Sequence, residues 1–447
     1  MTRMIRPICG RLLALAAVAA LTAVLAQPAA VASFSGFGPM SASAQYGQQM
    51  TFRVELPGGA PQRLELLLDF GDQPGSTFVA PVEASGRSAT YTWDASKQYL
   101  TPNTRIVYRW RATMDGQAQL SATGQLLYAD NRPGFAWQIA RYGPATVHWY
   151  GNHEDEARHF GDLSSGAISR AESLLGHRLT GAIDIFVYVS QADFFGALGP
   201  GAREWTGAAT YPNIRTVFMW LGGGPTDYLE TAVVHELTHV VFHDATANPY
   251  HEPARWLNEG LAVWSERQNA DAQRVTVRAE TNAGLFAFDA IVGQFPIGSR
   301  GSSLAYAEGT TMVDRIMRTY GRGAIARIAA AYRSGATDAE ALKAGTGVTA
   351  ATLYADYFRS FGATQPTPIT ATAIKPSIVR TPRGAAGSGP LGAPAGSGTA
   401  VAASGTSGAL EVATIIGLVV FAALAVAGVT AGLVIYRRGG PQGGDHG

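Results

Sequence analysis

The chain is most tightly constrained by a His-Glu-Leu-Thr-His sequence at residues 235–239. Residues i and i+4 of an α-helix lie on one face, so the imidazoles of His235 and His239 can converge on a single metal ion. Glu236 follows His235 directly, where its carboxylate can reach a water molecule at the metal site without binding the metal itself. The sequence therefore predicts a helix through residues 235–239 and requires a third ligand from elsewhere in the chain.

Glu259 is the expected third ligand. A zinc hydrolase needs neutral or anionic ligands on three sides of the ion and an open position for water. Glu259 lies 20 residues beyond His239, on a second predicted helix at 254–267. The connection is long enough for the chain to reverse direction, so an antiparallel helix can point Glu259 back at the two histidines. We therefore expect one Zn²⁺ ion, with Glu236 as the general base that takes a proton from the attacking water.

The start of the first helix can also be predicted. Asp227 is suited to cap it, and Glu230 three residues further on completes a capping-box arrangement. We expect the metal-binding helix to begin near Asp227.

The composition excludes several partners and ligands. The formal net charge is +1 and no stretch of the chain is markedly basic, which argues against nucleic acid as a partner. The only cysteine, Cys9, lies within the first 32 residues. The rest of the chain therefore has no thiolate to offer to zinc and no disulfide.

The N-terminal residues indicate export. Residues 1–32 contain three arginines, an apolar run at 12–26 and Ala-Val-Ala at 30–32, which is the pattern of a cleaved secretory signal peptide. An uncleaved anchor is the alternative, but the apolar run is short for a bilayer span.

The C-terminal residues indicate a membrane anchor. Residues 413–436 are an uncharged apolar stretch long enough to span a bilayer, and Arg437 and Arg438 mark its cytoplasmic side. We expect a single-pass cell-membrane protein with its N-terminal ectodomain outside and a cytoplasmic tail at 437–447. Residues 365–411 are rich in Pro, Gly, Ala, Ser and Thr, which predicts a flexible linker between the folded part and the membrane.

Two folded regions precede the linker. Residues 33–131 show short alternating runs, such as Leu64, Leu66, Leu68 and Phe70, separated by turn clusters. This pattern predicts an all-β, immunoglobulin-like sandwich, whose expected role is that of a spacer or an accessory binding surface.

From residue 136 the pattern is mixed α and β. Strands are predicted at 145–150, 183–189 and 216–221, and a helix at 162–176. The stretch 304–361 is predicted to be helical with breaks at glycines, and Thr337 with Glu340 marks one helix start.

The motifs resemble those of a known family. His-Glu-Leu-Thr-His, followed at this distance by Trp-Leu-Asn-Glu-Gly-Leu-Ala at 256–262, is similar to the gluzincin zinc metallopeptidases, especially the peptidase MA-like domain of many exported bacterial proteins. The similarity covers residues 136–362. It implies a thermolysin-like α+β catalytic domain with the sheet and metal helices at 136–285 and a helical subdomain at 286–362. It also implies three zinc ligands, one catalytic acid/base and a protein or peptide substrate. The residues that match these roles are the ligands His235, His239 and Glu259 and the acid/base Glu236.

The resemblance is less definite about the other roles. A hydrogen-bond donor to the oxyanion is expected from farther along the chain. Tyr306 is the first candidate and His251 the second, although a core tyrosine and a loop histidine are the plain alternatives. The strand at 216–221 fits, in chain order, the edge strand that pairs with extended substrate.

Two other positions distinguish this chain from related zinc peptidases. Ala245 stands where a metzincin has its third histidine, and His243 near the helix end is explained by the helix dipole. Thermolysin-like enzymes place a carboxylate four residues past the ligand glutamate, where this chain has Val263. Glu266, on the same helix face as Glu259, can take that place.

The sequence thus predicts a membrane-anchored extracellular zinc metallopeptidase. We favour an endopeptidase, because no acidic residue stands beside the glycines at 222–224 to hold a substrate amino group. Two alternatives stay open. One is a non-catalytic cell-surface binding or scaffold protein with a gluzincin-like domain, and the other is a zinc hydrolase that acts on non-peptide amides or esters.

Overall fold

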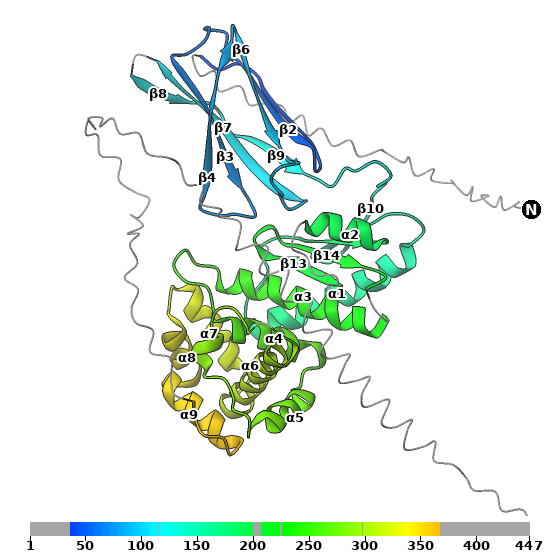
Figure 1. The fold of residues 1–447 in the computed structure, drawn as a ribbon, viewed down its shortest axis with the longest axis vertical. Helices are drawn as coiled ribbons and strands as arrows, with labels where there is room; N and C mark the ends of the chain where they lie inside the picture. The colour runs from blue at the N-terminus through cyan, green and yellow to red at the C-terminus, as the bar shows by residue number, and fades with distance from the viewer. Residues whose placement is uncertain (1–35, 115, 200–206, 224–225, 297, 367–447) are drawn as a thin grey trace, which may run out of the picture.

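The computed structural model describes residues 36–366 except 115, 200–206, 224–225 and 297 (Figure 1). The predicted signal peptide (1–32), membrane segment (413–436) and tail (437–447) lie outside the described residues, as does the linker 365–411 beyond its first two residues. No helix in the described part of the chain is long and apolar enough to cross a membrane.

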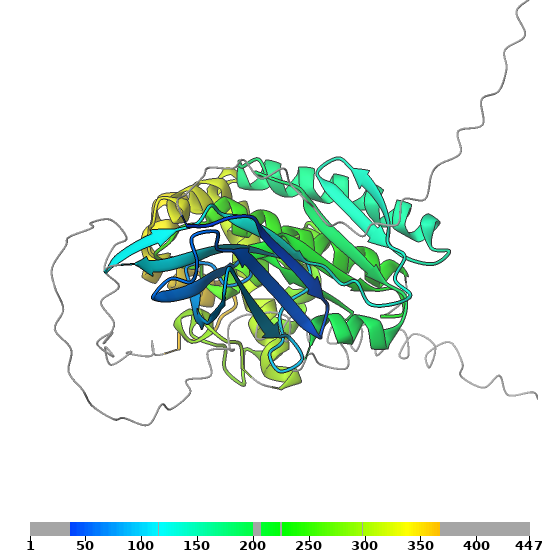
Figure 2. The ribbon, with the colours of Figure 1, turned by 90° about the horizontal axis from the view of Figure 1, so that it is seen from above.

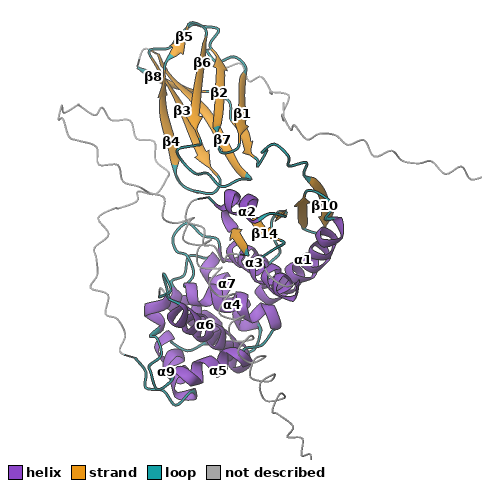
Figure 3. Cartoon of the chain, turned by 45° about the vertical axis from the view of Figure 1, so that its right-hand side comes forward, coloured by secondary structure: helices purple, strands orange, loops and turns teal. Residues whose placement is uncertain are grey.

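The N-terminal region is a β-sandwich (Figure 3). One antiparallel sheet has the order β1-β2-β6-β5, and the other has the order β4-β3-β7-β8, with β9 also paired to β7. Leu64, Leu66 and Leu68 of β3 are buried between the sheets, so the alternation that predicted this strand is confirmed. The immunoglobulin-like topology stays a prediction. The strands are β1 (Met40–Gln45), β2 (Gln49–Glu55), β3 (Arg63–Phe70), β4 (Thr77–Val82), β5 (Ala84–Ser85), β6 (Ser88–Asp94), β7 (Thr104–Met114), β8 (Gln117–Leu120) and β9 (Gly124–Tyr128).

A second, mixed sheet follows, with the order β10-β11-β12-β14-β13. Its central strand is β12, in which five of six residues are buried, as expected for a strand covered on both faces. Helices α1 and α3 pack side by side on one face, and α2 covers the other. The elements are β10 (Gln138–Tyr142), β11 (Ala145–Trp149), α1 (Glu154–Leu175), β12 (Ile183–Tyr188), α2 (Gln191–Leu198), β13 (Ala208–Tyr211), η1 (Pro212–Ile214), β14 (Thr216–Trp220) and α3 (Thr226–Thr246).

The structure corrects two sequence predictions in this sheet. The strand at 216–221 was expected at the edge, but β14 is hydrogen-bonded to β12 on one side and to β13 on the other. The edge strand is therefore β13, which is antiparallel to β14. Helix α1 begins at Glu154 rather than at residue 162, and acidic side chains in its first turn favour this earlier start through the helix dipole.

The C-terminal region is helical, as predicted. Gly321, Gly335 and Gly347 follow the ends of successive helices, all with positive φ angles, and Thr337 forms the expected capping box with Glu340. The helices are α4 (Arg255–Arg267), α5 (Asp271–Glu280), η2 (Phe288–Ile291), α6 (Ser299–Tyr320), α7 (Gly323–Arg333), α8 (Asp338–Thr346) and α9 (Ala350–Ser360).

The sandwich is joined to the mixed sheet by specific hydrogen bonds. The hydroxyl groups of Tyr46 and Tyr99 donate to the carbonyls of Gly196 and Ala197, at 2.9 and 2.7 Å. The Tyr188 hydroxyl of β12 donates to the Asp130 carboxylate at 2.9 Å. These contacts bury polar groups of both parts, so the sandwich is held against the α2 side of the sheet, over the rest of the chain in Figure 2.

Helices α4 and α6 cross at two glycines. A Cβ atom on Gly260 would lie 2.4 Å from the carbonyl carbon of Gly309, and one on Gly309 would lie 2.4 Å from the carbonyl oxygen of Trp256. Real Cβ atoms do not approach backbone this closely, so the glycines are what allow the two helices to touch. The contact matters for the site described below, because Gly260 directly follows Glu259.

We expect Gly260→Ala to lower the free energy of unfolding by about 3 kcal/mol, since the added methyl group can be accommodated only if α4 and α6 move apart. Urea unfolding of the variant measures this loss. Gly323→Ala is the control, because a Cβ there meets only the end of the flexible Arg327 side chain. An equal stability of the two variants would contradict the close crossing.

Glu308 of α6 is a buried carboxyl that forms no ion pair with any described residue. It accepts hydrogen bonds from the backbone N–H of Phe286, at 3.1 Å to each oxygen. Burial outweighs this interaction and raises the pKa of Glu308 to about 8. The folded protein therefore keeps this group protonated at neutral pH.

A pH dependence of stability follows. Between pH 4.5 and about 8 the unfolded chain releases the Glu308 proton while the folded chain retains it, so the stability falls as the pH rises, by about 4 kcal/mol across this range. We expect Glu308→Gln to remove this part of the pH dependence while keeping an acceptor for Phe286. Urea unfolding of both proteins from pH 4.5 to 8 measures the difference, and parallel curves would refute the shifted pKa.

Candidate metal centre

Helix α3, which contains the two histidines, lies in the core of the protein. It begins at Thr226, one residue before the predicted start, and every residue from Ala232 to Phe242 is buried. A helix that is apolar on all sides is covered on all sides. His235, Glu236 and His239 are therefore polar groups in an apolar core, where each needs a partner.

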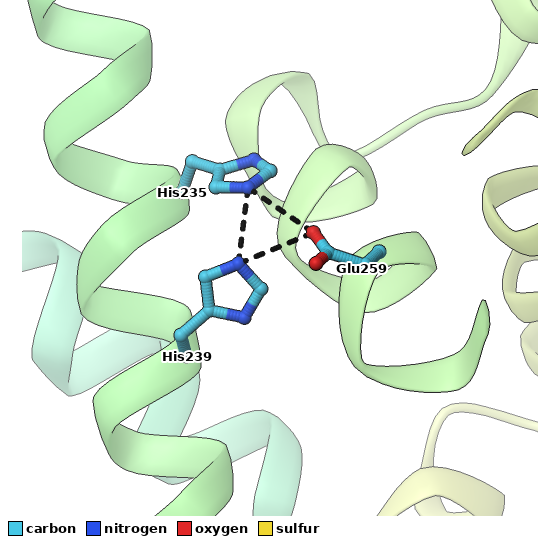
Figure 4. A group of neighbouring side chains, drawn as sticks. All are labelled: His235, His239 and Glu259. Carbon is cyan, nitrogen blue, oxygen red and sulfur yellow. Dashed lines mark hydrogen bonds and ion pairs between the residues drawn. The ribbon is translucent and has the colours of Figure 1, made fainter. Parts of the chain in front are cut away.

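The structure brings His235, His239 and Glu259 together (Figure 4). The two Nε2 atoms are 3.1 Å apart, and the Glu259 Oε2 atom lies 3.7 Å from that of His235 and 3.4 Å from that of His239. Helix α4 packs against α3 and presents Glu259 to the histidine face, as the sequence predicted. All three side chains are buried.

The outer nitrogen of each imidazole is already engaged. Nδ1 of His235 lies 2.8 Å from Oε1 of Glu266, and Nδ1 of His239 lies 2.8 Å from Oδ1 of Asn258. Because both partners are acceptors, each Nδ1 carries a proton, and Nε2 is the atom that can offer a lone pair to the centre once it is unprotonated. Glu266 thus occupies the place that the sequence suggested for it.

These residues fit a zinc ion. Two lone-pair nitrogens and a carboxylate oxygen converge, and Glu259 Oε2 has no hydrogen-bond donor in the described part of the chain. Ligands about 2.1 Å from an ion at tetrahedral angles are about 3.4 Å apart, which is close to the separations seen between these atoms. Three electron-pair donors that face one another in a buried site repel one another unless a metal ion or a proton lies between them. Among the described residues no cysteine joins the cluster, and two histidines with one glutamate are a donor set known from catalytic zinc sites.

The buried groups shift one another's pKa values. Burial lowers the pKa of His235, but Glu259 and Glu266 outweigh burial and raise it to about 10, so a metal ion that binds here must displace the proton from Nε2 of His235. Burial raises the pKa of Glu259, whereas the two histidines more than offset this and hold it below its usual range. Burial raises the pKa of Glu236, which makes its carboxylate a stronger base. The site therefore contains one carboxylate that stays ionised and another that is suited to accept a proton.

Glu236 lies beside the ligand cluster without joining it. Its Oε2 atom is buried and has no hydrogen-bond partner among the described residues. The Thr210 hydroxyl of β13 donates to the backbone carbonyl of Glu236 at 3.2 Å, which ties the edge strand to the metal helix. An unpartnered buried carboxylate is costly in an ordinary core and is typical of a functional site.

Tyr306 of α6 reaches the same centre. Its side chain hydrogen-bonds with the Glu259 carboxylate, and burial together with that carboxylate raises its pKa well above the usual value. The hydroxyl group therefore stays protonated and can donate. His251 behaves differently: its Nε2 lies 3.0 Å from Asp338 and its ring stacks on Tyr332, so its interactions are with α7 and α8. Of the two oxyanion candidates, the structure places Tyr306 against a ligand.

Three neighbours of the cluster were missed by the sequence analysis. Asn258, which orients His239, could have been suspected from its position next to Glu259. Arg255 precedes Glu259 by one turn, acts electrostatically on Tyr306, and has a buried Nη1 atom without a hydrogen-bond partner in the described region. Nothing in the sequence near Thr210 indicates that it contacts the metal helix, because its position depends on the pairing of β13 with β14.

The Glu266–His235 contact predicts the effect of a substitution. Glu266→Gln keeps a hydrogen-bond acceptor but removes the charge that strengthens the imidazole as a ligand, so we expect zinc affinity to fall by about 10- to 100-fold. Competition with a chromophoric chelator measures this affinity. Glu252→Gln, in the exposed loop before α4, is the control, and an unchanged affinity in both variants would contradict the role of Glu266.

Comparison with known proteins gives one family match. Residues 164–361 match the model of the Peptidase MA superfamily. No curated protein sequence matches the chain. The matched range contains α3, α4 and α6, which carry the metal cluster.

Solved structures give weaker likenesses. The M1 zinc metallopeptidase of Deinococcus radiodurans is 12% identical, with a TM-score of 0.32, over 72% of this chain and 92% of that one. An aminopeptidase N family protein of Idiomarina loihiensis is 9% identical, with a TM-score of 0.38, over 72% and 75% of the two chains. The protein BhCBM56 is 8% identical, with a TM-score of 0.18, over 21% and 95%. TM-scores this low do not establish a shared fold.

Proposed function

The chain carries a domain of the Peptidase MA superfamily, and from this premise we propose that it is a zinc-dependent endopeptidase. The observation that carries the proposal is the convergence of His235, His239 and Glu259 beside Glu236, whose buried Oε2 atom has no hydrogen-bond partner among the described residues. A binding or scaffold protein has no need of a buried general base beside a three-ligand site.

The side chains divide the work of amide hydrolysis. When bound, Zn²⁺ would polarise the scissile carbonyl and lower the pKa of water. Glu236 accepts a proton from the attacking water and later passes a proton to the leaving amine. The Tyr306 hydroxyl, which hydrogen-bonds with the ligand Glu259, is the donor that we assign to the developing negative charge on the carbonyl oxygen. Glu266 and Asn258 hold the two imidazoles in orientation throughout.

The edge strand β13 gives the site a place for an extended peptide. One side of β13 pairs with β14, and no described strand pairs with the other side. Helix α3 packs against β13, and Thr210 links the strand to Glu236. A substrate that adds to this free edge would pass its backbone beside the base.

The described residues of the edge strand support internal cleavage over removal of N-terminal residues. An aminopeptidase needs a carboxylate to hold the substrate ammonium group, and β13 has none in its sequence Ala-Ala-Thr-Tyr.

Peptide cleavage tests the proposal. The full-length protein, incubated with an N-acetylated and C-amidated peptide mixture, is expected to cut internal bonds, to stop when 1,10-phenanthroline is added and to recover with Zn²⁺. Stepwise release of residues from unblocked peptides alone would indicate an aminopeptidase. Zinc binding without cleavage of any peptide would overturn the peptidase proposal and favour hydrolysis of another amide or ester.

We also propose that the catalytic part is displayed outside the cell on a membrane tether. The proposal is supported by the secretory pattern at 1–32 and by the apolar stretch 413–436 with the arginines that follow it. Cell fractionation is expected to place the protein in the membrane, with its N-terminal part digested by protease added to intact cells. Recovery in the soluble fraction would refute the tether.

A further inference from the structure

A polar cavity of about 300 Å³ lies between α5, α6 and α9, and it has no part in the metal centre. Its walls carry four arginines, Arg274 and Arg278 from α5 and Arg315 and Arg318 from α6, with one carboxylate, Asp314. Arg274 and Arg278 are four residues apart, and Arg315 and Arg318 are three apart. The two arginines of each helix therefore lie on the same helix face, which lines the cavity.

Only half of this positive charge is neutralised. Asp314 pairs with Arg274 and, at 2.7 Å, with Arg318, and it also accepts a hydrogen bond from the Trp264 indole at 3.1 Å. Arg274 has a second partner, Asp271, at 2.5 Å. Neither Arg278 nor Arg315 forms an ion pair or a side-chain hydrogen bond with any described residue. These two guanidinium groups line a cavity that is open to solvent, and no described residue accepts a hydrogen bond from either of them.

The repulsion between these like charges raises the free energy of the folded protein, and a bound anion would lower it. Cations on adjacent helices repel one another unless a negative group lies between them. Guanidinium groups match the oxygens of phosphate with paired, charge-assisted hydrogen bonds. The cavity is also far larger than one water molecule needs, which leaves room for more than a bare ion. The Thr319 hydroxyl on its wall can bind the polar remainder of a ligand, and the Ser360 hydroxyl, which already donates to the Tyr357 carbonyl at 2.6 Å, can still accept a hydrogen bond from it.

We propose that this cavity binds the phosphate group of a small organic phosphate ester, through Arg278 and Arg315. The ester has two sources that share this chemistry, a soluble sugar phosphate and the headgroup of an anionic lipid. The site is separate from the metal centre and does not depend on the peptidase activity. Its occupation would brace α5 against α6, the helix that also carries Tyr306.

The test is calorimetric titration of the zinc-loaded full-length protein with glucose 6-phosphate, dihexanoyl phosphatidic acid and, as the uncharged control, glucose. The key variant is Arg278→Gln/Arg315→Gln, which breaks no ion pair of the described structure. The matched control is Arg300→Gln/Arg359→Gln, which also removes two charges, from exposed arginines outside the cavity that pair with Glu280 and Asp356.

We expect at least one phosphate ester to bind the wild type and the control variant, and to bind the Arg278→Gln/Arg315→Gln protein at least about 10-fold more weakly. Binding of the sugar phosphate alone identifies a soluble ligand, and binding of the lipid alone identifies a headgroup. Absence of binding by both esters, or equal affinity for the two variants, overturns the proposal. Unchanged zinc content and peptide cleavage in both variants show that the fold and the metal centre are intact.

Discussion

Glu236→Gln is expected to lower the rate of peptide cleavage by about 10³-fold or more and to leave the zinc content unchanged. The amide has the same shape as the carboxylate but cannot accept the proton of the attacking water. The change should not unfold the protein, because Glu236 Oε2 has no hydrogen-bond partner to lose in the described structure. Single-turnover cleavage of a blocked peptide, with metal analysis of the same sample, measures both effects.

The control for this experiment lies on the same helix. Glu230 is two turns before Glu236 and forms an exposed pair with His159 at 2.8 Å, so Glu230→Gln tests a loss of charge on α3 away from the centre. Full activity is expected in that variant. Substantial cleavage by Glu236→Gln would contradict the assignment of Glu236 as the general base.

The second large effect concerns the metal itself. Glu259→Gln replaces the anionic ligand by a neutral amide between two imidazoles, so we expect loss of bound zinc and of cleavage together. Zinc also stabilises the fold, because it binds the folded chain and not the unfolded one; at a free concentration about 1,000 times Kd the gain is about 4 kcal/mol. We expect this gain in the wild type and its absence in Glu259→Gln.

Thermal unfolding with zinc and with a chelator measures the difference. Glu236→Gln is the informative control, because it keeps all three ligands and should show the full stabilisation while lacking activity. A zinc-dependent gain in stability that persists in Glu259→Gln would show that the ion binds elsewhere.

The metal cluster could be predicted from sequence because its geometry is local. Helical periodicity fixes His235 and His239 on one face, and a short connection places Glu259 on the next helix. The same reasoning reached Glu266, two turns beyond Glu259, where the structure shows its contact with His235. The three predicted ligands therefore lie together in the fold. Their role as zinc ligands stays a proposal, which the substitutions above test.

The order of strands in the sheet could not be predicted in the same way. Residues 216–220 form a strand, as expected, but whether β14 lies inside the sheet or at its edge depends on where β13 pairs, and β13 is only four residues long. Long-range pairing of this kind leaves no periodic signal. The error moved the expected substrate-binding edge by one strand.

The contacts between the β-sandwich and the mixed sheet could not be predicted from the sequence either. Asp130 accepts from the Tyr188 hydroxyl and pairs with Arg132, and nothing in the pattern of residues near 130 indicates such an interface. The same is true of the arginine cavity, because Arg278 and Arg315 meet only when α5 packs on α6.

The central claim is that His235, His239 and Glu259 hold the zinc ion of this protein. Zinc X-ray absorption spectroscopy of the full-length protein, purified without chelators, tests it most directly when the wild type is compared with Glu259→Gln. We predict one zinc per chain, bound by two imidazole nitrogens and a carboxylate oxygen with no sulfur, and loss of that spectrum in the variant. Absence of zinc from the wild type, or an identical zinc spectrum in Glu259→Gln, would contradict the claim.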